Sequence, residues 1–196
     1  MRVLAVTGGI GSGKSHIVNM FASMGIPVYD TDSRAKSLYD ESQWLKESIA
    51  DLLGHDLLEN GRLRRDLMAK RLFADPLLLM KLEALVHPAV VEDFLKWKER
   101  KRENGAKFVI MESAIFLEKE ILPPLADKVL VVSAPLDLRI SRVMKRSSLS
   151  KGEIEKRIAN QWSDGQREKF ADFVIYSDES KALLPQILVI YKKMIG

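Results

Sequence analysis

The 196-residue sequence contains no cysteine. Disulfide bonds, zinc ribbons, thiolate-ligated clusters and cysteine nucleophiles are therefore excluded. No apolar run is long enough to span a bilayer, and the short run at residues 1–7 leads into glycines without a small-residue cleavage site. We therefore expect a chain that does not enter a membrane and whose N-terminus is part of the fold, and the cytoplasm is its default location.

Internal repeats, low-complexity tracts and flexible linkers are also absent, so we expect one folding unit with attached subdomains. The formal net charge is +4. Such an excess suits a nucleic-acid binder, and it suits equally well an enzyme whose substrates carry phosphates. Charge alone does not separate these two classes.

Strands and helices alternate along most of the chain. Apolar runs typical of buried strands lie at residues 2–7, 27–29, 108–112, 129–133 and 173–176. Apolar residues at three- and four-residue spacing predict helices at residues 14–24, 33–39, 43–53, 64–73, 77–86, 89–102, 136–146, 150–161 and 180–194. Strands of almost continuous apolar character between helices indicate a parallel sheet that is covered on both faces.

Residues 8–15 read Gly-Gly-Ile-Gly-Ser-Gly-Lys-Ser and match the phosphate-binding loop (P-loop) pattern in full, between a predicted strand and a predicted helix. Glycines let the backbone amides turn toward a triphosphate, and the helix N-terminus adds its dipole. Lys14 is predicted to reach the β- and γ-phosphates, and the Ser15 hydroxyl to bind Mg²⁺. The alternative, a glycine-rich turn with a solvated lysine, accounts poorly for eight matching positions in this context.

The candidate ATP contacts in this region are Gly9, Ile10, Gly11, Ser12, Gly13, Lys14, Ser15 and His16. His16 follows the motif, and its position equally suits a side chain on the helix surface. The chain has no Asn-Lys-x-Asp segment for reading guanine and no strand that ends in the acid pair of motor ATPases, so a kinase is favoured.

The predicted fold class is α/β, with a P-loop NTPase-like parallel β-sheet flanked by helices, a helical substrate-binding insertion and a helical lid. We assign residues 1–30, 104–136 and 164–196 to the nucleotide-binding core. Residues 31–103 form the insertion and residues 137–163 form the lid segment.

Two carboxylates, Asp30 and Asp32, follow the second strand at the edge where open α/β sheets bind ligands. A carboxylate there can accept the proton of an attacking hydroxyl or hold a metal ion through water, and we assign both roles to Asp32. The alternative is helix capping, because Asp32 or Ser33 would be a suitable N-cap for the next helix.

Arginines gather in the lid segment. Arg139, Arg142 and Arg146 are spaced by three and four residues and so share one face of a helix, and Arg157 lies on the next helix. Such a face can close over a triphosphate and stabilise the transferred phosphoryl group, which makes Arg142 a catalytic candidate and Arg142 and Arg146 candidate ATP contacts. A solvated basic face is the alternative.

The order of these motifs resembles the dephospho-coenzyme A kinase family over essentially the whole chain. The similar segments are residues 7–15, 30–32, 61–65, 72–73, 82–83, 87–88, 108–118, 139–146, 157–161 and 171–177. The sequence departs from the family pattern at Glu112 for Asp, Ala114 for Pro, Arg139 for Gln and Ser177 for Asn.

The resemblance implies transfer of the γ-phosphoryl group of Mg·ATP to the 3′-hydroxyl of dephospho-coenzyme A, the last step of coenzyme A biosynthesis. Asp32 would be the base, and Asp32, Arg65, His87 and Glu112 would contact the acceptor. Glu112, at the end of a strand, could serve the metal ion as well as the acceptor. For His87 the alternative is a polar residue before a helix-starting proline, and for Glu112 an acid that faces solvent. The resemblance implies ATP and dephospho-coenzyme A as the only partners, without nucleic acid or membrane, and a monomer is expected.

Several apolar residues of the insertion are predicted to be packing core rather than a substrate groove: Leu67, Leu72, Phe73, Leu82, Leu85 and Val86. Two rival functions remain open. One is another P-loop kinase that acts on a nucleoside, a nucleotide or a small alcohol. The other is a nucleotide-dependent switch or binding protein, which predicts slow ATP turnover that small acceptors do not stimulate.

Overall fold

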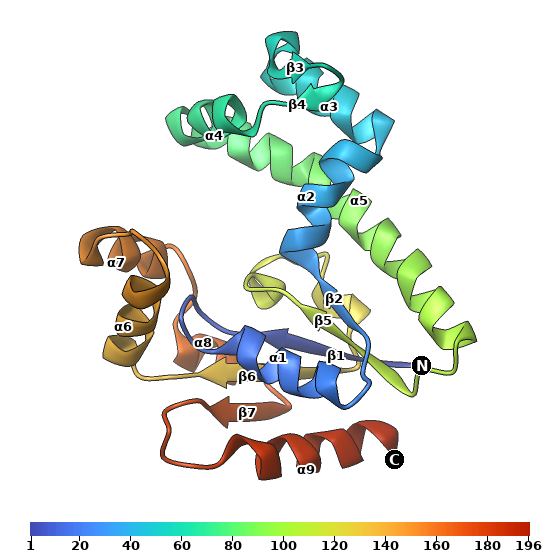
Figure 1. Ribbon diagram of the computed structural model, residues 1–196, viewed down its shortest axis with the longest axis vertical. Helices are drawn as coiled ribbons and strands as arrows, with labels where there is room; N and C mark the ends of the chain where they lie inside the picture. The colour runs from blue at the N-terminus through green and yellow to red at the C-terminus, as the bar shows by residue number, and fades with distance from the viewer. The chain divides into compact units, whose positions relative to one another are not determined.

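The computed structural model describes all 196 residues and divides into two compact units, Met1–Asp30 with Lys98–Gly196, and Thr31–Trp97. A five-stranded sheet forms the centre of the first unit (Figure 1). Its strands are β1 (Arg2–Thr7), β2 (Val28–Asp30), β5 (Phe108–Glu112), β6 (Lys128–Ser133) and β7 (Phe173–Tyr176). The strand order is β2-β5-β1-β6-β7, and every neighbouring pair is parallel. The predicted α/β fold with a parallel sheet is confirmed.

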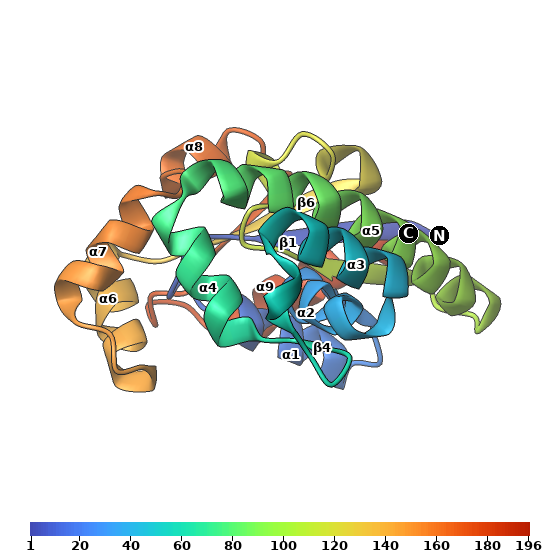
Figure 2. The ribbon, with the colours of Figure 1, turned by 90° about the horizontal axis from the view of Figure 1, so that it is seen from above.

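Helices cover both faces of this sheet. The helices α1 (Lys14–Ser23) and α9 (Leu183–Ile195) lie side by side on one face, and α8 (Asp164–Glu168) lies on the other (Figures 1 and 2). Phe21 and Tyr191 both contact the ring of Phe108 edge-on in the core beneath α1 and α9. The strands are apolar along most of their length because both of their faces are buried.

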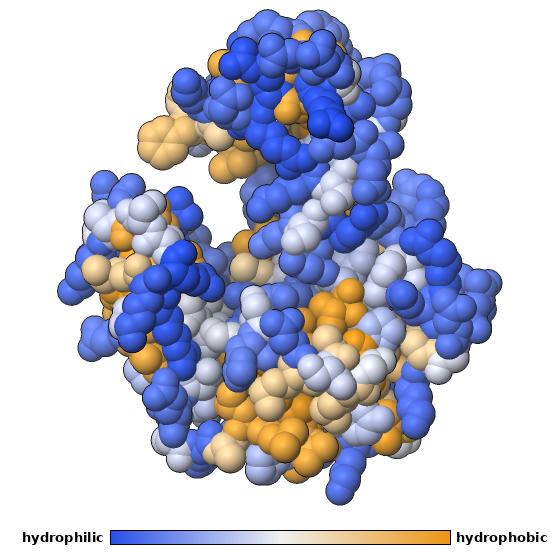
Figure 3. Space-filling model, in the orientation of Figure 1, coloured by the Kyte–Doolittle hydropathy of each residue, from blue (hydrophilic) through white to orange (hydrophobic).

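The C-terminal helix differs from the prediction at its start. Ser180 donates through its N–H and its hydroxyl to the Asp178 carboxylate in a turn, so α9 begins only at Leu183. Leu184 and Leu188 of this helix remain at least 40% exposed, and Figure 3 shows apolar surface over α9. No helix in the structure combines the length and the apolar character that a bilayer crossing requires.

The lid segment belongs to the first unit. It contains α6 (Leu136–Arg146) and α7 (Lys151–Ala159), which pack on one another around Ile140, Val143 and Ile154. A capping box starts α7, because the Ser150 hydroxyl accepts from the Glu153 N–H and the Glu153 carboxylate accepts from the Ser150 N–H. Whether this segment acts as a lid stays a prediction.

The second unit is mostly helical, with α2 (Thr31–Glu41), α3 (Gln43–Leu53), α4 (Arg65–Ala74) and the first part of α5 (Pro76–Glu103). The insertion was predicted to be helical, but between two of its helices β3 (Leu58–Glu59) and β4 (Arg62–Leu63) form an antiparallel hairpin. Its turn residues Asn60 and Gly61 have φ values of 51° and 75°. The Asn-Gly pair is a known signal for such a turn and outweighs the helical pattern around it.

A second correction concerns the long helix. Two helices were predicted at residues 77–86 and 89–102, but α5 is continuous and contains Pro88. A proline inside a helix removes one backbone hydrogen bond. Burial of Val86 and Val90 on either side of Pro88 favours the uninterrupted helix.

Candidate active site

The P-loop connects β1 to α1 and is packed too tightly for side chains at several positions. Gly11 and Gly13 have φ values of 79° and 98°, which L-residues rarely adopt. A Cβ atom at Gly9 would clash with the guanidinium of Arg139, and one at Gly11 would clash with the Arg139 carbonyl. Gly13 begins α1 without a side-chain cap, so the positive end of the helix dipole faces the loop. The residues of the motif therefore form the backbone cradle that a phosphate chain requires.

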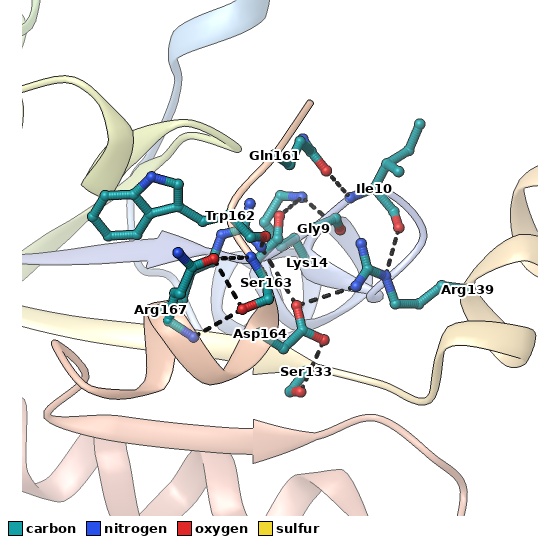
Figure 4. Close-up of polar contacts among 12 residues, drawn as sticks. Gly9, Ile10, Lys14, Ser133, Arg139, Gln161, Trp162, Ser163, Asp164 and Arg167 are labelled. Atoms are coloured by element: carbon teal, nitrogen blue, oxygen red, sulfur yellow. Dashed lines mark hydrogen bonds and ion pairs between the residues drawn. The ribbon is translucent and has the colours of Figure 1, made fainter. Parts of the chain in front are cut away.

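Lys14 folds back over this loop. Its ammonium group donates to the carbonyl oxygen of Gly8 at 2.8 Å and lies 3.5 Å from that of Gly9 (Figure 4). The positive charge is thus held at the loop itself, where bound phosphate oxygens would collect.

Ser15 and Glu112 meet beside the loop. The Ser15 hydroxyl donates to the Glu112 carboxylate at 3.2 Å, and Glu112 ends β5 in register with Val6 of β1 and Asp30 of β2. Because the strands are parallel, Asp30 and Glu112 lie at the same carboxyl end of the sheet, and α1 brings the Ser15 hydroxyl to Glu112. Sequence reasoning left Glu112 open to the acceptor or the metal ion, and the structure brings it to Ser15, the residue predicted to bind the metal ion.

The second unit holds the other predicted acceptor contacts. Asp32 and Ser33 lie inside the first turn of α2, which begins at Thr31, so neither is the N-cap. Arg65 donates to the Asp40 carboxylate at 2.8 Å and to the Lys36 carbonyl at 2.7 Å, and its guanidinium lies 5.5 Å from the centre of the Tyr39 ring. The pKa of Tyr39 is raised, chiefly by burial.

Other predicted residues of the second unit differ in how deeply they are buried. His87 is half-buried within α5. Leu82 and Val86 belong to the core as predicted, but Phe73 is 94% exposed, so its assignment to the core was wrong. Phe73 lies in the last turn of α4, which ends at Ala74.

The arginines of α6 do not act as one exposed face. Arg142 donates to the Ser177 hydroxyl at 3.3 Å and pairs with Glu179 at 3.8 Å, next to Gly13. Arg146 and Arg157 are exposed. Arg139 is only 5% exposed and turns toward the P-loop, so the alternative of a solvated basic face does not hold for this residue.

A cavity of about 350 Å³ opens beside the start of α1. Its lining residues are Gly13, His16, Arg142, Ser177, Glu179, Lys181 and Leu183. His16 is exposed on α1 and is part of this lining, and its contact with ATP stays a prediction. Glu179, Lys181 and Leu183 were missed because they lie in and after a loop without any motif. A positive φ of 69° at Glu179 shows how tightly this loop turns.

Sequence reasoning also missed a buried polar network behind the P-loop (Figure 4). Arg139 bonds to the Ile10 carbonyl and to Asp164, and Asp164 in turn lies 3.5 Å from Arg167. The side chain of Arg167 is fully buried and pairs with Glu118 at 2.6 Å. Burial lowers the pKa of Arg139, and the neighbouring Asp164 opposes this effect.

Comparison with known proteins gives a consistent result. A family model described as dephospho-CoA kinase matches residues 2–182. The dephospho-CoA kinase of Porphyromonas gingivalis is 37% identical over 189 residues, which cover 96% of this chain and 92% of the relative.

Solved structures agree with the sequence relatives. TT1252 of Thermus thermophilus superposes with a TM-score of 0.81 at 31% identity over 99% of this chain and 96% of that one. For a dephospho-CoA kinase of Campylobacter jejuni the TM-score is 0.72 at 25% identity, with 99% and 98% coverage.

Proposed function

Because this chain belongs to the dephospho-CoA kinase family, we infer that it is a kinase that carries out the final step of coenzyme A biosynthesis. It transfers the γ-phosphoryl group of ATP to the 3′-hydroxyl of dephospho-coenzyme A and releases ADP. The observation that carries this conclusion is the family match over residues 2–182, with the complete P-loop folded between β1 and α1.

The P-loop is the proposed binding site of the ATP phosphates. Its glycines and the N-terminus of α1 offer backbone amides, and Lys14 supplies a charge that can move from the Gly8 carbonyl to the β- and γ-phosphates. Phosphoryl transfer requires mainly positioning and electrostatic stabilisation, and this loop provides both.

Magnesium is the metal ion that we propose for the site. The Ser15 hydroxyl and the Glu112 carboxylate, 3.2 Å apart, are hard oxygen ligands of the kind that Mg²⁺ prefers. When bound, Mg²⁺ neutralises charge that develops on the phosphates. We propose that Ser15 and Glu112 hold it, and that Asp32 contributes through water.

We propose that the cavity of about 350 Å³ beside α1 receives the nucleoside part of ATP. It adjoins Gly13 at the end of the loop, and Arg142 and Ser177 bring polar groups to its wall. Arg142 would leave Ser177 to contact the triphosphate, and the exposed Arg146 would join it when the lid segment closes.

The acceptor is assigned to the second unit. Asp32, in the first turn of α2, is the proposed base that takes the proton of the 3′-hydroxyl. Arg65 already binds a carboxylate, that of Asp40, and a phosphate of the acceptor would compete for the same guanidinium. His87 is the second proposed contact. A monomer in the cytoplasm is the setting that we propose for this reaction.

The test is ADP formation from Mg·ATP with and without dephospho-coenzyme A, with mass detection of the product. We expect turnover that depends on the acceptor and a product heavier by one phosphoryl group. ATP binding without stimulation by this acceptor would contradict the assignment and would favour another hydroxyl acceptor. The variant Lys14→Ala serves as the control for contaminating kinases.

A further inference from the structure

We propose that Arg139 is a positioning residue which, together with Gln161, fixes Ile10 of the P-loop and thereby couples the loop to both ends of the lid segment. This inference rests on the proposed nucleotide site. It concerns how that site is held in shape, and no step of phosphoryl transfer passes through Arg139 itself.

Ile10 is held at three points. Its N–H donates to Gln161 Oε1 at 2.9 Å, and its carbonyl oxygen accepts from Arg139 Nε at 3.0 Å (Figure 4). Its side chain packs against the apolar cluster of Ile140, Val143 and Ile154. Arg139 lies near the start of the lid segment and Gln161 near its end, so both ends of the segment bind one residue of the loop.

Arg139 is rigidly placed for this contact. Its guanidinium lies against Gly9 and its own carbonyl lies against Gly11, so the residue touches the loop on both sides of Ile10. Two of its nitrogens are used, Nε for Ile10 and Nη1 for Asp164 at 3.2 Å. The third, Nη2, is buried and donates to no protein acceptor.

Asp164, the carboxylate that pairs with Arg139, is itself hydrogen-bonded to the central sheet. Asp164 accepts from the Ser133 hydroxyl at the end of β6, at 3.1 Å, and starts α8. The fully buried Arg167 ties the same helix to Glu118. A buried pair is weakly screened by solvent, and removal of either partner leaves an uncompensated charge. Asp164 therefore fixes the guanidinium, and the guanidinium fixes the loop.

The contacts of Arg139 also fix the position of α6 against the P-loop. Arg142 lies three residues after Arg139 and next to Gly13 in the nucleotide cavity. A shift of Arg139 would therefore change both the backbone of the P-loop and the reach of Arg142. We expect the loss of Arg139 to weaken interactions with the nucleotide much more than interactions with the acceptor.

The experiment measures ADP binding to the full chain by calorimetry in the absence of acceptor, together with KM for ATP and for dephospho-coenzyme A. We expect Arg139→Met, which keeps a long side chain but removes the charge and the hydrogen-bond donors, to raise the Kd for ADP and the KM for ATP about tenfold, with KM for the acceptor changed by less than about twofold. Asp164→Asn should have a similar effect. The double variant should be no worse than either single variant, because both act through one contact.

The matched control is Ile190→Val, which removes one methylene group from the core beneath α9, away from the loop. It should lower the melting temperature and leave the Kd for ADP unchanged. If Arg139→Met does not fold, Arg139→Lys keeps a positive charge beside Asp164 but has one nitrogen in place of the two that bond to Ile10 and Asp164, and a smaller rise in Kd is expected.

Two results would overturn the proposal. One is wild-type ADP binding by a folded Arg139 variant that has merely lost stability. The other is an equal loss of affinity for ATP and for the acceptor. Because ADP binding is measured without acceptor, failure of the wild-type enzyme to make coenzyme A would contradict the proposed function and leave this test intact.

Discussion

The donor side and the acceptor side of this kinase are built in different ways. Near the P-loop, the buried side chains of Arg139 and Arg167 both pair with the half-buried Asp164. In the second unit the candidate contact Arg65 lies at the surface, with its side chain 42% exposed. The proposed nucleotide site is thus held in shape without substrate, whereas the role proposed for Arg65 requires it to exchange a protein partner for a substrate phosphate.

The largest effect is expected at the centre of the donor side. Lys14→Ala removes the charge that the loop holds beside Gly8 and should lower kcat about 10³-fold, because no other cation lies within the motif. The measurement is coenzyme A formation at saturating substrates. Lys156→Ala, on the exposed face of α7, is the matched control and should retain wild-type turnover. If kcat falls only slightly in Lys14→Ala, this lysine does not stabilise the transferred phosphoryl group.

Asp32→Asn tests whether a residue of the second unit contributes to kcat, as the P-loop is expected to do. Loss of a general base should lower kcat about 10²-fold while the Kd for ADP stays unchanged. Asp51→Asn replaces an exposed carboxylate of the same unit and should behave like the wild type. Near-normal turnover in Asp32→Asn would show that Asp32 is not the general base.

Glu112→Gln separates the metal role of this residue from the acceptor role. The amide can still accept a hydrogen bond from Ser15, but it has no charge, so the Mg²⁺ concentration for half-maximal activity should rise about tenfold. Activity is measured over a magnesium titration at fixed ATP, with the exposed Glu120→Gln as control. If only the KM for dephospho-coenzyme A rises, Glu112 contacts the acceptor and does not bind the metal ion.

The smallest effect is expected at the opposite edge of the sheet, outside both regions. Burial raises the pKa of Asp172, but the hydrogen bonds from Lys128 Nζ and the Val129 N–H outweigh it, and the net pKa lies below its usual value. The carboxylate therefore stabilises the fold above its unfolded pKa of about 3.9, and this contribution disappears as pH falls through the lower folded pKa.

Asp172→Asn should lower the free energy of unfolding at pH 7 by about 1 kcal/mol or less, because the pair is partly exposed and screened. Denaturant unfolding at pH 7 and at pH 3 gives the measurement. The difference between wild type and variant should shrink at the lower pH, and kcat should be unaffected at pH 7. A difference that grows on acidification would contradict the assigned direction of the pKa.

Much of this protein could be predicted from the sequence because the decisive signals are local. Residues 8–15 are contiguous, and their glycines determine the loop conformation wherever the chain places it. The nearly continuous apolar strands indicated a parallel sheet in the same way, since burial on both faces excludes polar alternation. Even the missed hairpin had a local signal in Asn60 and Gly61.

Only the tertiary structure decided which distant side chains meet. Ser15 and Glu112 are 97 residues apart in sequence, and Gln161 lies 151 residues from the Ile10 that it binds. Such pairs depend on strand order, register and helix packing, which no short window of sequence contains. Arg139 shows the difference: spacing placed it on a basic helix face, but the partners Ile10 and Asp164, which determine its burial and its proposed role, come from other parts of the fold.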